Sequence, residues 1–326
     1  MGPRVEAMES RMFGSLWPVS PLALGGGGIG QVWGSTSREE AVATVRAAVD
    51  GGINLIDVAP SYGDGEAERV IGDALDGRLP DGVRISTKHH VGHDPSNVEA
   101  KARRSLEESL TRMGVDSVDV FILHSQIVPA PDPGREAWTT PMRLFNEAAR
   151  PALQRLVDDG RVGAWGITAV QFPQVLGAVL AEQPRPQVGQ MITNIFDAPG
   201  DMSWSPEPAD HRRLISRANE LGMAVMGIRA VQAGALTDQL DRDVPAHNPV
   251  ARDYERATPI RHIAAELGMS TASLAHRYAL TMEGVHTVVL GVKNRAELAE
   301  SLAAAEAGPL PSDVVTRIDK TILRPD

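Results

Sequence analysis

Four chemically active side chains follow short apolar runs in the first half of the chain. Asp57, Lys88 and His124 each come directly after a run that reads as a strand, and Tyr62 lies five residues beyond Asp57. Helical stretches separate these runs, so the strands are expected to be parallel and to end at one rim. A carboxylate, a phenol, an ammonium and an imidazole would then meet there, which predicts a proton-transfer site.

The phenol of Tyr62 gives this combination a chemical purpose. An isolated tyrosine has a pKa of about 10 and is a poor proton donor at neutral pH. The ammonium of Lys88 favours the phenolate, so we expect it to lower that pKa toward the working range. Asp57 would hold the ammonium, and His124 would donate a hydrogen bond to a carbonyl oxygen. The alternative interpretation of Asp57 and Lys88 is a purely structural ion pair at the rim.

The elements that position these residues alternate between strand-like and helix-like segments about eight times. This pattern, without an internal linker, predicts one domain over residues 1–326 that folds as a (β/α)8 TIM barrel. We expect an N-terminal strand or hairpin before it and extended loops on the C-terminal side of the strands. The expected strands end near Gly25, Asp57, Lys88, His124, Thr168, Ile192, Ile228 and Leu290.

Helix starts are legible at two capping boxes, in which a serine is followed three residues later by a glutamate. Ser37 and Glu40 predict a helix that runs through Val49, and Ser96 and Glu99 predict another. The spacing of apolar residues over 311–323 predicts a final helix.

Three long connections follow strands and should form the rim around the binding site. They cover residues 125–145, 193–210 and 229–256, and within the last of them 246–253 reads as irregular. Tryptophans in the rim loops, Trp33, Trp138 and Trp204, are expected to shape the substrate pocket.

Composition excludes several classes of protein. The 326-residue chain has a net charge of −10, which argues against a nucleic-acid partner because such a protein needs a basic face. It has no cysteine, so no disulfide or thiolate metal site can form. Neither a signal-peptide core nor a run of ~18 apolar residues occurs, which predicts a soluble, cytoplasmic protein that does not enter a membrane. The sequence does not indicate the oligomeric state.

Longer motifs resemble those of one family. The segments are 52–68, 105–124, 160–168 and 291–293. Their residues and their order along the chain resemble the signatures of the aldo-keto reductase superfamily, in particular of its bacterial-type members. The resemblance covers nearly the whole chain. It implies an enzyme that transfers hydride between a nicotinamide cofactor and an aldehyde or ketone, or in reverse an alcohol or sugar. The catalytic residues would be Asp57, Tyr62, Lys88 and His124, with Tyr62 as general acid or base.

The resemblance also implies the cofactor site, with NADP(H) expected and NAD(H) as the alternative. Thr168 and Gln190 fall where the family binds the nicotinamide carboxamide, although Ala169 replaces the usual asparagine after Thr168. Ile228 stands where many relatives stack an aromatic ring. The remaining candidate cofactor-binding residues are Arg229, Gly291, Lys293, Arg295, Glu297 and Ser301.

Cations near a helix N-terminus are suited to phosphate, which favours NADPH through Lys293, Arg295 and Arg229. Glu297 and Ser301 stand where NADPH-preferring relatives often carry arginine and asparagine, and they weaken that preference.

Three other interpretations remain open. The glycines of 25–30 formally match a dinucleotide fingerprint, but no helix follows directly, so a mobile loop is favoured. A metal-dependent barrel hydrolase could use His89, His90, His93 and His124. His89 could alternatively face the substrate from a solvated loop. A non-catalytic regulatory subunit that senses the cofactor is the third interpretation.

Overall fold

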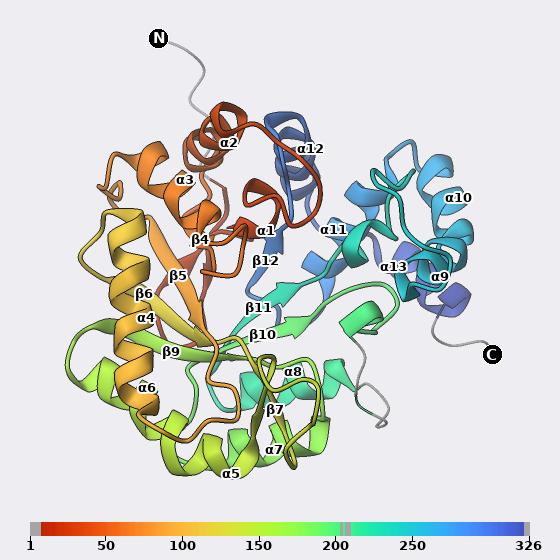
Figure 1. The fold of residues 1–326 in the computed structure, drawn as a ribbon. Helices are drawn as coiled ribbons and strands as arrows, with labels where there is room; N and C mark the ends of the chain where they lie inside the picture. The colour runs from red at the N-terminus through yellow and green to blue at the C-terminus, as the bar shows by residue number, and fades with distance from the viewer. Residues whose placement is uncertain (1–7, 203–204, 206–209, 323–326) are drawn as a thin grey trace.

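Each expected apolar run forms a strand, and the eight strands close into one parallel barrel (Figure 1). The computed structural model describes residues 8–202, 205 and 210–322. The strands are β3 (Leu22–Gly25), β4 (Leu55–Asp57), β5 (Arg84–His89), β6 (Val118–Leu123), β9 (Val162–Thr168), β10 (Val188–Ile192), β11 (Ala224–Ile228) and β12 (Thr287–Leu290). Their neighbours in the sheet follow chain order around the barrel, and β12 pairs with β3 to close it. The predicted (β/α)8 barrel is confirmed.

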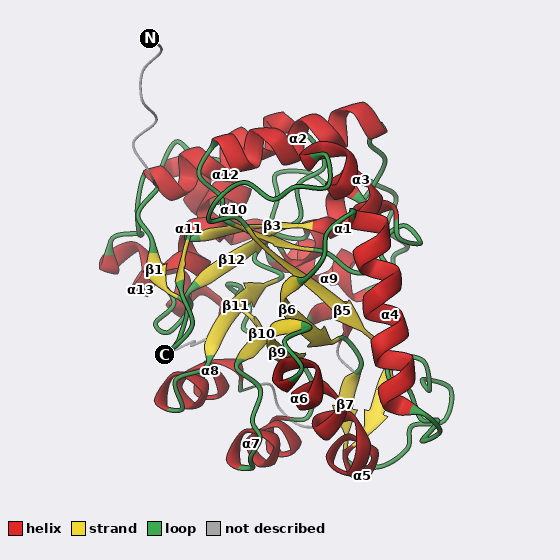
Figure 2. Cartoon of the chain, turned by 90° about the vertical axis from the view of Figure 1, so that its left-hand side faces the viewer, coloured by secondary structure: helices red, strands yellow, loops and turns green. Residues whose placement is uncertain are grey.

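Helices surround the strands, as Figure 2 shows with helices in red around yellow strands. The longer helices are α2 (Arg38–Asp50), α3 (Glu66–Leu75), α4 (Val98–Met113), α6 (Arg150–Asp158), α7 (Pro173–Ala181), α8 (His211–Glu220), α10 (Thr258–Glu266), α11 (Thr271–Thr281), α12 (Arg295–Glu306) and α13 (Ser312–Ile322). A short helix, α5 (Met142–Leu144), continues through a π-helical turn over 145–149 into α6. None of the described helices is both long and apolar enough to cross a membrane.

The two predicted capping boxes behave differently. Ser37 caps α2, and its side chain accepts a hydrogen bond from the backbone N–H of Glu40, as expected. The prediction that Ser96 caps α4 is wrong, because the N-cap is Asn97 in a left-handed conformation. The backbone N–H and the hydroxyl of Ser96 instead donate to Asp94, so this serine closes a turn before the helix. The final helix is α13, which packs against α10.

The barrel interior is filled by alternate residues of the strands. Leu55, Ile122, Val188 and Met226 belong to one buried apolar cluster inside the barrel. The predicted N-terminal hairpin is present as β1 (Arg11–Met12) paired with β2 (Pro18–Val19). Phe13 in its turn packs into the same interior cluster, so the hairpin closes the end of the barrel opposite the strand carboxyl ends.

The rim loops contain more regular structure than the sequence indicates. The connection after β6 holds β7 (Gln126–Val128) and β8 (Thr139–Pro141), which pair in a small sheet of their own. The connections after β10 and β11 hold short 3-10 turns at Gly200–Met202 and Gln232–Gly234.

The reading of 246–253 as irregular is wrong over its second half, where α9 (Pro249–Arg256) begins. Asn248 caps this helix by accepting from the N–H of Val250, and Pro249 takes the first helical position, where its missing N–H costs nothing.

The glycine run after β3 forms a buried helical turn, α1 (Gly26–Ile29), rather than a loop. A Cβ at Gly28 would lie 2.0 Å from the carbonyl oxygen of Val292, and one at Gly27 would lie 2.4 Å from the indole Nε1 of Trp33. Glycine is therefore required because the backbone passes directly against the chain that follows β12.

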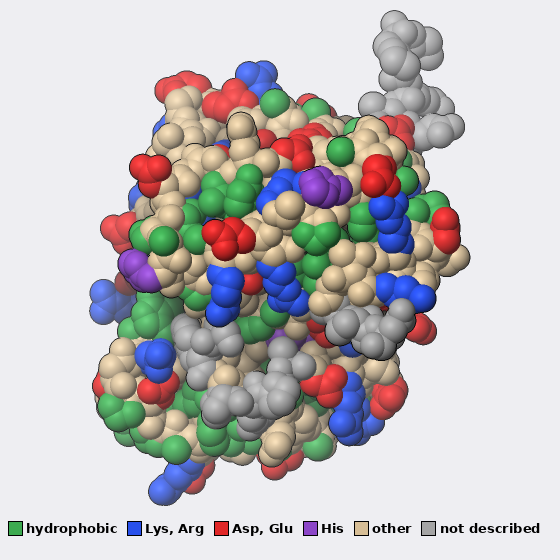
Figure 3. Space-filling model, turned by 90° about the vertical axis from the view of Figure 1, so that its right-hand side faces the viewer, with side chains coloured by type: hydrophobic (Ala, Val, Ile, Leu, Met, Phe, Trp, Pro, Cys, Tyr) green, Lys and Arg blue, Asp and Glu red, His purple; other side chains and the backbone are tan. Residues whose placement is uncertain are grey.

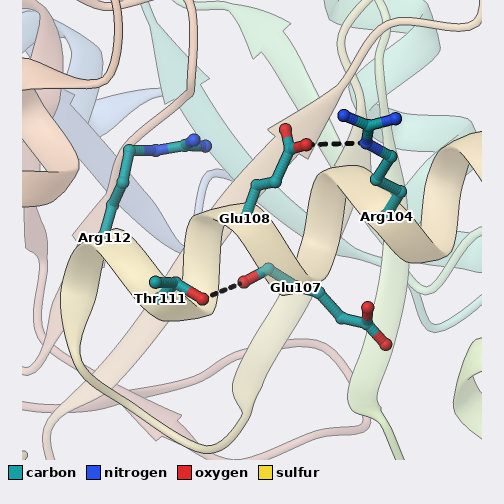
Figure 4. A pocket seen from close by; sticks show the side chains of 5 residues that line it. All are labelled: Arg104, Glu107, Glu108, Thr111 and Arg112. Carbon is teal, nitrogen blue, oxygen red and sulfur yellow. Dashed lines mark hydrogen bonds and ion pairs between the residues drawn. The ribbon is translucent and has the colours of Figure 1, made fainter.

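A buried carboxylate connects α3 to its neighbours. Glu68 has no exposed surface; it accepts hydrogen bonds from Thr87 on β5 and from Arg112 on α4, both at 2.6 Å. Figure 4 shows the outer surface of α4, where Arg104 and Glu108 form a second, solvent-exposed pair at 2.8 Å.

Both pairs involve an arginine of α4, one with a buried glutamate and one with an exposed glutamate, so they test how burial changes the contribution of an ion pair to stability. Glu68→Ala should lower the free energy of unfolding by about 3 kcal/mol, because Arg112 and Thr87 lose a desolvated partner. Glu108→Ala should change it by less than about 0.5 kcal/mol, since exposed pairs contribute little. Urea unfolding of both variants measures the difference. Equal losses would mean that the Glu68 contacts do not stabilise the packing of α3.

Candidate active site

A buried ion pair lies at the carboxyl end of the barrel. Lys88 is fully buried, and its Nζ donates to Asp57 Oδ2 and to the carbonyl oxygen of Val58, each at 2.8 Å. The carboxylate of Asp57 accepts two further hydrogen bonds. Ser86 Oγ donates to Oδ1 at 2.8 Å, and Gln190 Nε2 donates to Oδ2 at 2.9 Å. The ammonium and the carboxylate are therefore both hydrogen-bonded away from water.

The strand geometry explains why these residues meet. Successive side chains of a strand point to opposite faces, so Asp57, His124 and Gln190 share the inward face with Leu55, Ile122 and Val188. In the register of the barrel, Asp57 lies beside Ser86 and Lys88 beside Ile122. Asp57 ends β4, Lys88 lies one residue before the end of β5, His124 follows β6 directly, and Gln190 lies two residues before the end of β10, so their side chains gather at the carboxyl end of the barrel.

Tyr62 and His124 lie next to the ion pair. The ammonium nitrogen of Lys88 is 4.7 Å from the centre of the Tyr62 ring. The rings of Tyr62 and His124 meet edge to face, with centroids 5.7 Å apart. The structure thus brings together the four side chains named from the sequence.

The electrostatics of Tyr62 differ from the expectation. Burial raises the pKa of the phenol above its ordinary value, and although Lys88 acts to lower it, burial outweighs Lys88. The expected net lowering is therefore wrong, because desolvation disfavours the phenolate more than the ammonium favours it. The phenol consequently keeps its proton at neutral pH.

The ammonium and imidazole take complementary charge states. Burial acts to lower the pKa of Lys88, but Asp57 and Tyr62 outweigh it, so the net pKa is raised and the amine stays charged. Burial, assisted by Lys88 and His90, holds the pKa of His124 well below its usual value. His124 is therefore a neutral imidazole, and its buried Nδ1 makes no hydrogen bond within the described residues.

A second imidazole lies at the mouth, that of His90, which the sequence suggests only as a possible metal ligand. His90 lies two residues beyond Lys88, and its ring centroid is 4.6 Å from that of His124. His89 does not face the substrate side, as the sequence allows, but stacks on Phe121 with the ring centroids 6.1 Å apart. The alternation of β5 was the available signal, because residues two apart share a face.

Sequence reasoning missed Ser86, although the same rule places it inward beside Asp57. The outer rim adds Trp138, a half-exposed residue whose ring stands perpendicular to that of His90 at 5.1 Å. Of the other rim tryptophans, Trp33 lies against Gly27 and Gly291, and Trp204 lies outside the described residues.

The candidate nicotinamide contacts lie beside the ion pair. Thr168 at the end of β9 and Gln190 in the middle of β10 are both buried, and the Thr168 hydroxyl is 3.5 Å from Gln190 Oε1. Because Gln190 also donates to Asp57, it links this corner of the mouth to the ion pair. Ile228, at the end of β11, is partly buried and shares the inward face with Met226.

The candidate phosphate cations are all paired with carboxylates. Arg229 adopts a left-handed conformation, and its buried guanidinium donates to Asp201 at 2.5 Å. Lys293 bonds Asp241, and it bonds Glu297 at 2.9 Å.

The N-terminus of α12 is engaged as well. Arg295 pairs with Glu40 at 2.8 Å, and Glu40 also accepts from the backbone N–H of Arg295. Asn294 caps the helix by accepting from the N–H of Glu297, and the buried Ser301 donates to the carbonyl oxygen of Glu297. Any phosphate bound here has to compete with these partners.

The face toward which β10 and β11 point is shown in Figure 3. Basic side chains gather near its centre, with acidic ones among them. Over the residues that the structure describes, no three His, Asp or Glu side chains are grouped so that they could hold a metal ion. The Nε2 of His93 instead bonds the Thr139 hydroxyl at 2.8 Å.

Comparison with known proteins agrees with the resemblance seen in the motifs. The profile described as "Aldo/keto reductase family" matches residues 21–323. The chain is 26% identical to L-galactose dehydrogenase of Arabidopsis thaliana, over 88% of this chain and 84% of that protein. It is also 26% identical to the aldo-keto reductase YhdN of Bacillus subtilis, over 91% and 88%.

A solved structure gives the same picture of the fold. An aldo-keto reductase from Klebsiella pneumoniae in complex with NADPH superposes with a TM-score of 0.69, at 21% identity, over 97% of this chain and 96% of that one.

The buried histidines predict a loss of stability in acid. Burial lowers the pKa of His89 and of His90 to about 4, whereas an unfolded histidine titrates near 6.5. Such groups stabilise the fold fully above about pH 6.5, and the contribution is lost as the pH falls toward 4, because only the unfolded chain takes up the proton.

The free energy of unfolding should therefore fall between pH 7 and pH 5, and His90→Phe should remove about 1–2 kcal/mol of that fall. His247→Phe, at an exposed position, is the control. Urea unfolding across this pH range measures both. An identical slope in His90→Phe and the unsubstituted protein would contradict the neutral state of His90.

Proposed function

Because the chain belongs to the Aldo/keto reductase family, we propose that it is an NADP(H)-dependent oxidoreductase that reduces an aldehyde or ketone. In reverse it would oxidise the corresponding alcohol or sugar. The observation that carries the proposal is the meeting of the Tyr62 phenol, the buried Lys88–Asp57 pair and the His124 imidazole at one barrel mouth. The chain would act as a single barrel domain on a small-molecule substrate.

In this proposal Tyr62 is the proton donor to the carbonyl oxygen. Its raised pKa keeps it protonated at neutral pH, which is the form that reduction requires. Lys88 makes the buried phenol more acidic than it would otherwise be, since its positive charge stabilises the phenolate left after transfer. Asp57 fixes the ammonium, and Ser86 and Gln190 fix Asp57. Asp57, Ser86 and Gln190 therefore position the ammonium of Lys88 beside the phenol.

His124 orients the substrate. A neutral imidazole can donate one hydrogen bond and accept another. The ring lies edge to face with Tyr62, and we expect its donor to bind the oxygen that receives the phenolic proton. Two donors on one carbonyl oxygen stabilise the negative charge that develops there during reduction.

The residues at the other strand ends fit a nicotinamide dinucleotide, which would supply or accept the hydride when bound. Thr168 and Gln190 offer a hydroxyl and an amide for the carboxamide, and Ile228 offers an apolar surface. Gly291 lies beside the indole of Trp33, where a Cβ would make an ordinary contact at 3.5 Å. The NADPH-bound relative of Klebsiella pneumoniae supports the same cofactor class.

Candidate phosphate contacts are Arg229, Lys293 and Arg295, with Glu297 in the first turn of α12 and Ser301 one turn further along it. Their carboxylate partners reduce the net positive charge available to a phosphate, so cofactor binding would involve exchange of these ion pairs.

Tyr62→Phe tests the proton donor. General acid catalysis contributes roughly 10²–10⁴-fold, so kcat for carbonyl reduction should fall at least that far while cofactor affinity is retained. Tyr254→Phe is the matched control, because Tyr254 lies on α9 and its hydroxyl donates to the carbonyl oxygen of Asp238. Steady-state kinetics with NADPH and a panel of aldehydes measures both. Turnover above about a tenth of the unsubstituted rate would remove Tyr62 from this role.

Cofactor preference provides a second test. NADPH should bind more tightly than NADH at low salt, and the difference should shrink as ionic strength screens the exposed charges. Glu297→Gln should tighten NADPH binding by about two- to fivefold, because Lys293 loses one of its carboxylate partners, and should leave NADH binding nearly unchanged.

Glu306→Gln, at the exposed far end of α12, is the control. Calorimetric titration at low and high salt measures the affinities. Equal affinities at low salt, or a preference for NADH, would instead make Glu297 a selector against the 2′-phosphate.

A further inference from the structure

Two neutral imidazoles, rather than one, face the proposed reaction centre. His90 and His124 lie with their ring centroids 4.6 Å apart and their planes inclined by 39°. His124 also contacts Tyr62, so the three rings form a continuous row along the mouth. Of these three rings, the proposed chemistry uses those of Tyr62 and His124, and it gives His90 no role.

Three of the four imidazole nitrogens of His90 and His124 lack a hydrogen-bond partner within the described residues. The Nδ1 of His124 and both ring nitrogens of His90 are buried, and none makes a hydrogen bond of normal geometry within the described residues. Lys88 acts to lower the pKa of His90, and a weak hydrogen-bonding contact with the backbone of Ala137 acts to raise it. Buried polar groups are nearly always satisfied, and those that are not need an explanation. A ligand that brings its own hydrogen-bonding groups provides one.

The ligand chemistry follows from what neutral imidazoles can bind. Each ring offers one donor and one acceptor, which matches a hydroxyl group, itself a donor and an acceptor. When His124 binds a carbonyl oxygen, the contacting ring of His90 is placed for an oxygen on the adjacent carbon. Anionic groups fit less well, because Lys88 is held by Asp57 and Arg229 is held by Asp201.

The surface beside His90 is also suited to a hydroxylated ligand. Trp138, with half of its surface exposed, stands perpendicular to the His90 ring at 5.1 Å. An exposed indole next to hydrogen-bonding groups can pack against the C–H groups of a molecule whose hydroxyls bind the imidazoles. A hydroxylated carbon chain has both kinds of group.

We propose that His90 is a substrate-recognition residue that hydrogen-bonds a hydroxyl on the carbon next to the carbonyl. The substrates of the site are then 2-hydroxyaldehydes or 2-hydroxyketones, including open-chain sugars. This inference rests on the proposed function, since it assigns the substrate class of the same site.

The test compares two aldehydes that differ by a single hydroxyl, 2-hydroxypropanal and propanal. The measured quantity is the ratio of their kcat/KM values with NADPH, each corrected for the unhydrated aldehyde. The unsubstituted protein should prefer 2-hydroxypropanal. His90→Phe keeps a ring of similar size without nitrogen atoms, and it should lower the ratio by about fivefold or more, the effect of losing one hydrogen bond. His90→Gln should restore part of the ratio.

His89→Phe is the matched control, because His89 is adjacent in sequence but stacks on Phe121 away from the mouth. It should leave the ratio unchanged even where it lowers the melting temperature. Should His90→Phe fail to fold, His90→Ala is measured instead and the same loss is expected. A ratio in the His90 variant within about twofold of the unsubstituted ratio overturns the inference, as does an unsubstituted protein without preference for the hydroxylated aldehyde.

A binding measurement separates this inference from the proposed function. Tryptophan fluorescence is titrated with propane-1,2-diol and with propan-1-ol in the presence of NADP⁺. Tighter binding of the diol, lost in His90→Phe, supports the role of His90 even if neither aldehyde is turned over, which would refute only the proposed reaction. Equal binding of the two alcohols by the unsubstituted protein refutes the role of His90.

Discussion

The buried pair of Asp57 and Lys88 is the interaction on which the rest of the site depends. Taking both ions out of water costs several kcal/mol each, and their attraction offsets this only when the remaining hydrogen-bonding capacity is satisfied. Here the carboxylate accepts from Ser86 and Gln190, and the ammonium donates to the carbonyl oxygen of Val58. Gln190 reaches Asp57 from β10 across the barrel, so the pair also fixes the width of the mouth.

The positions of the other rings follow from this pair. Tyr62 lies over the ammonium, and His124 lies against Tyr62. The ammonium also suppresses protonation of His124 and His90, because a second positive charge beside it is unfavourable. The mouth therefore contains one compensated ion pair surrounded by neutral donors. Fixed donors in an enclosed site stabilise a developing oxyanion without having to reorganise.

The opposite side of the mouth follows a different electrostatic arrangement. In a chain with a net charge of −10, Arg229, Lys293 and Arg295 are each neutralised by a nearby carboxylate. A buried guanidinium such as that of Arg229 would be costly without Asp201, since burial alone lowers its pKa. The same pairing weakens the attraction of this region for phosphate, and affinity then depends on how readily the partners are exchanged.

The sequence by itself determined the barrel, its hairpin and the four residues at its carboxyl end. These depend on local patterns, because apolar runs, their alternation with helices and the residue that ends each strand are all read within a few positions. The capping of α2 by Ser37 is equally local. The same kind of reasoning was wrong by one residue at α4, where Asp94 competed for the groups of Ser96.

Tertiary structure decided what depends on distant partners and on burial. It selected Gln190, 133 positions away, as a partner of Asp57, and it turned His90 rather than His89 toward the mouth. It also set the net direction of the Tyr62 pKa, since burial opposes the neighbouring ammonium and outweighs it. The carboxylates that neutralise the phosphate-site cations come from other loops and helices. Desolvation and ion pairing act through space, so they are fixed only when the chain has closed around them.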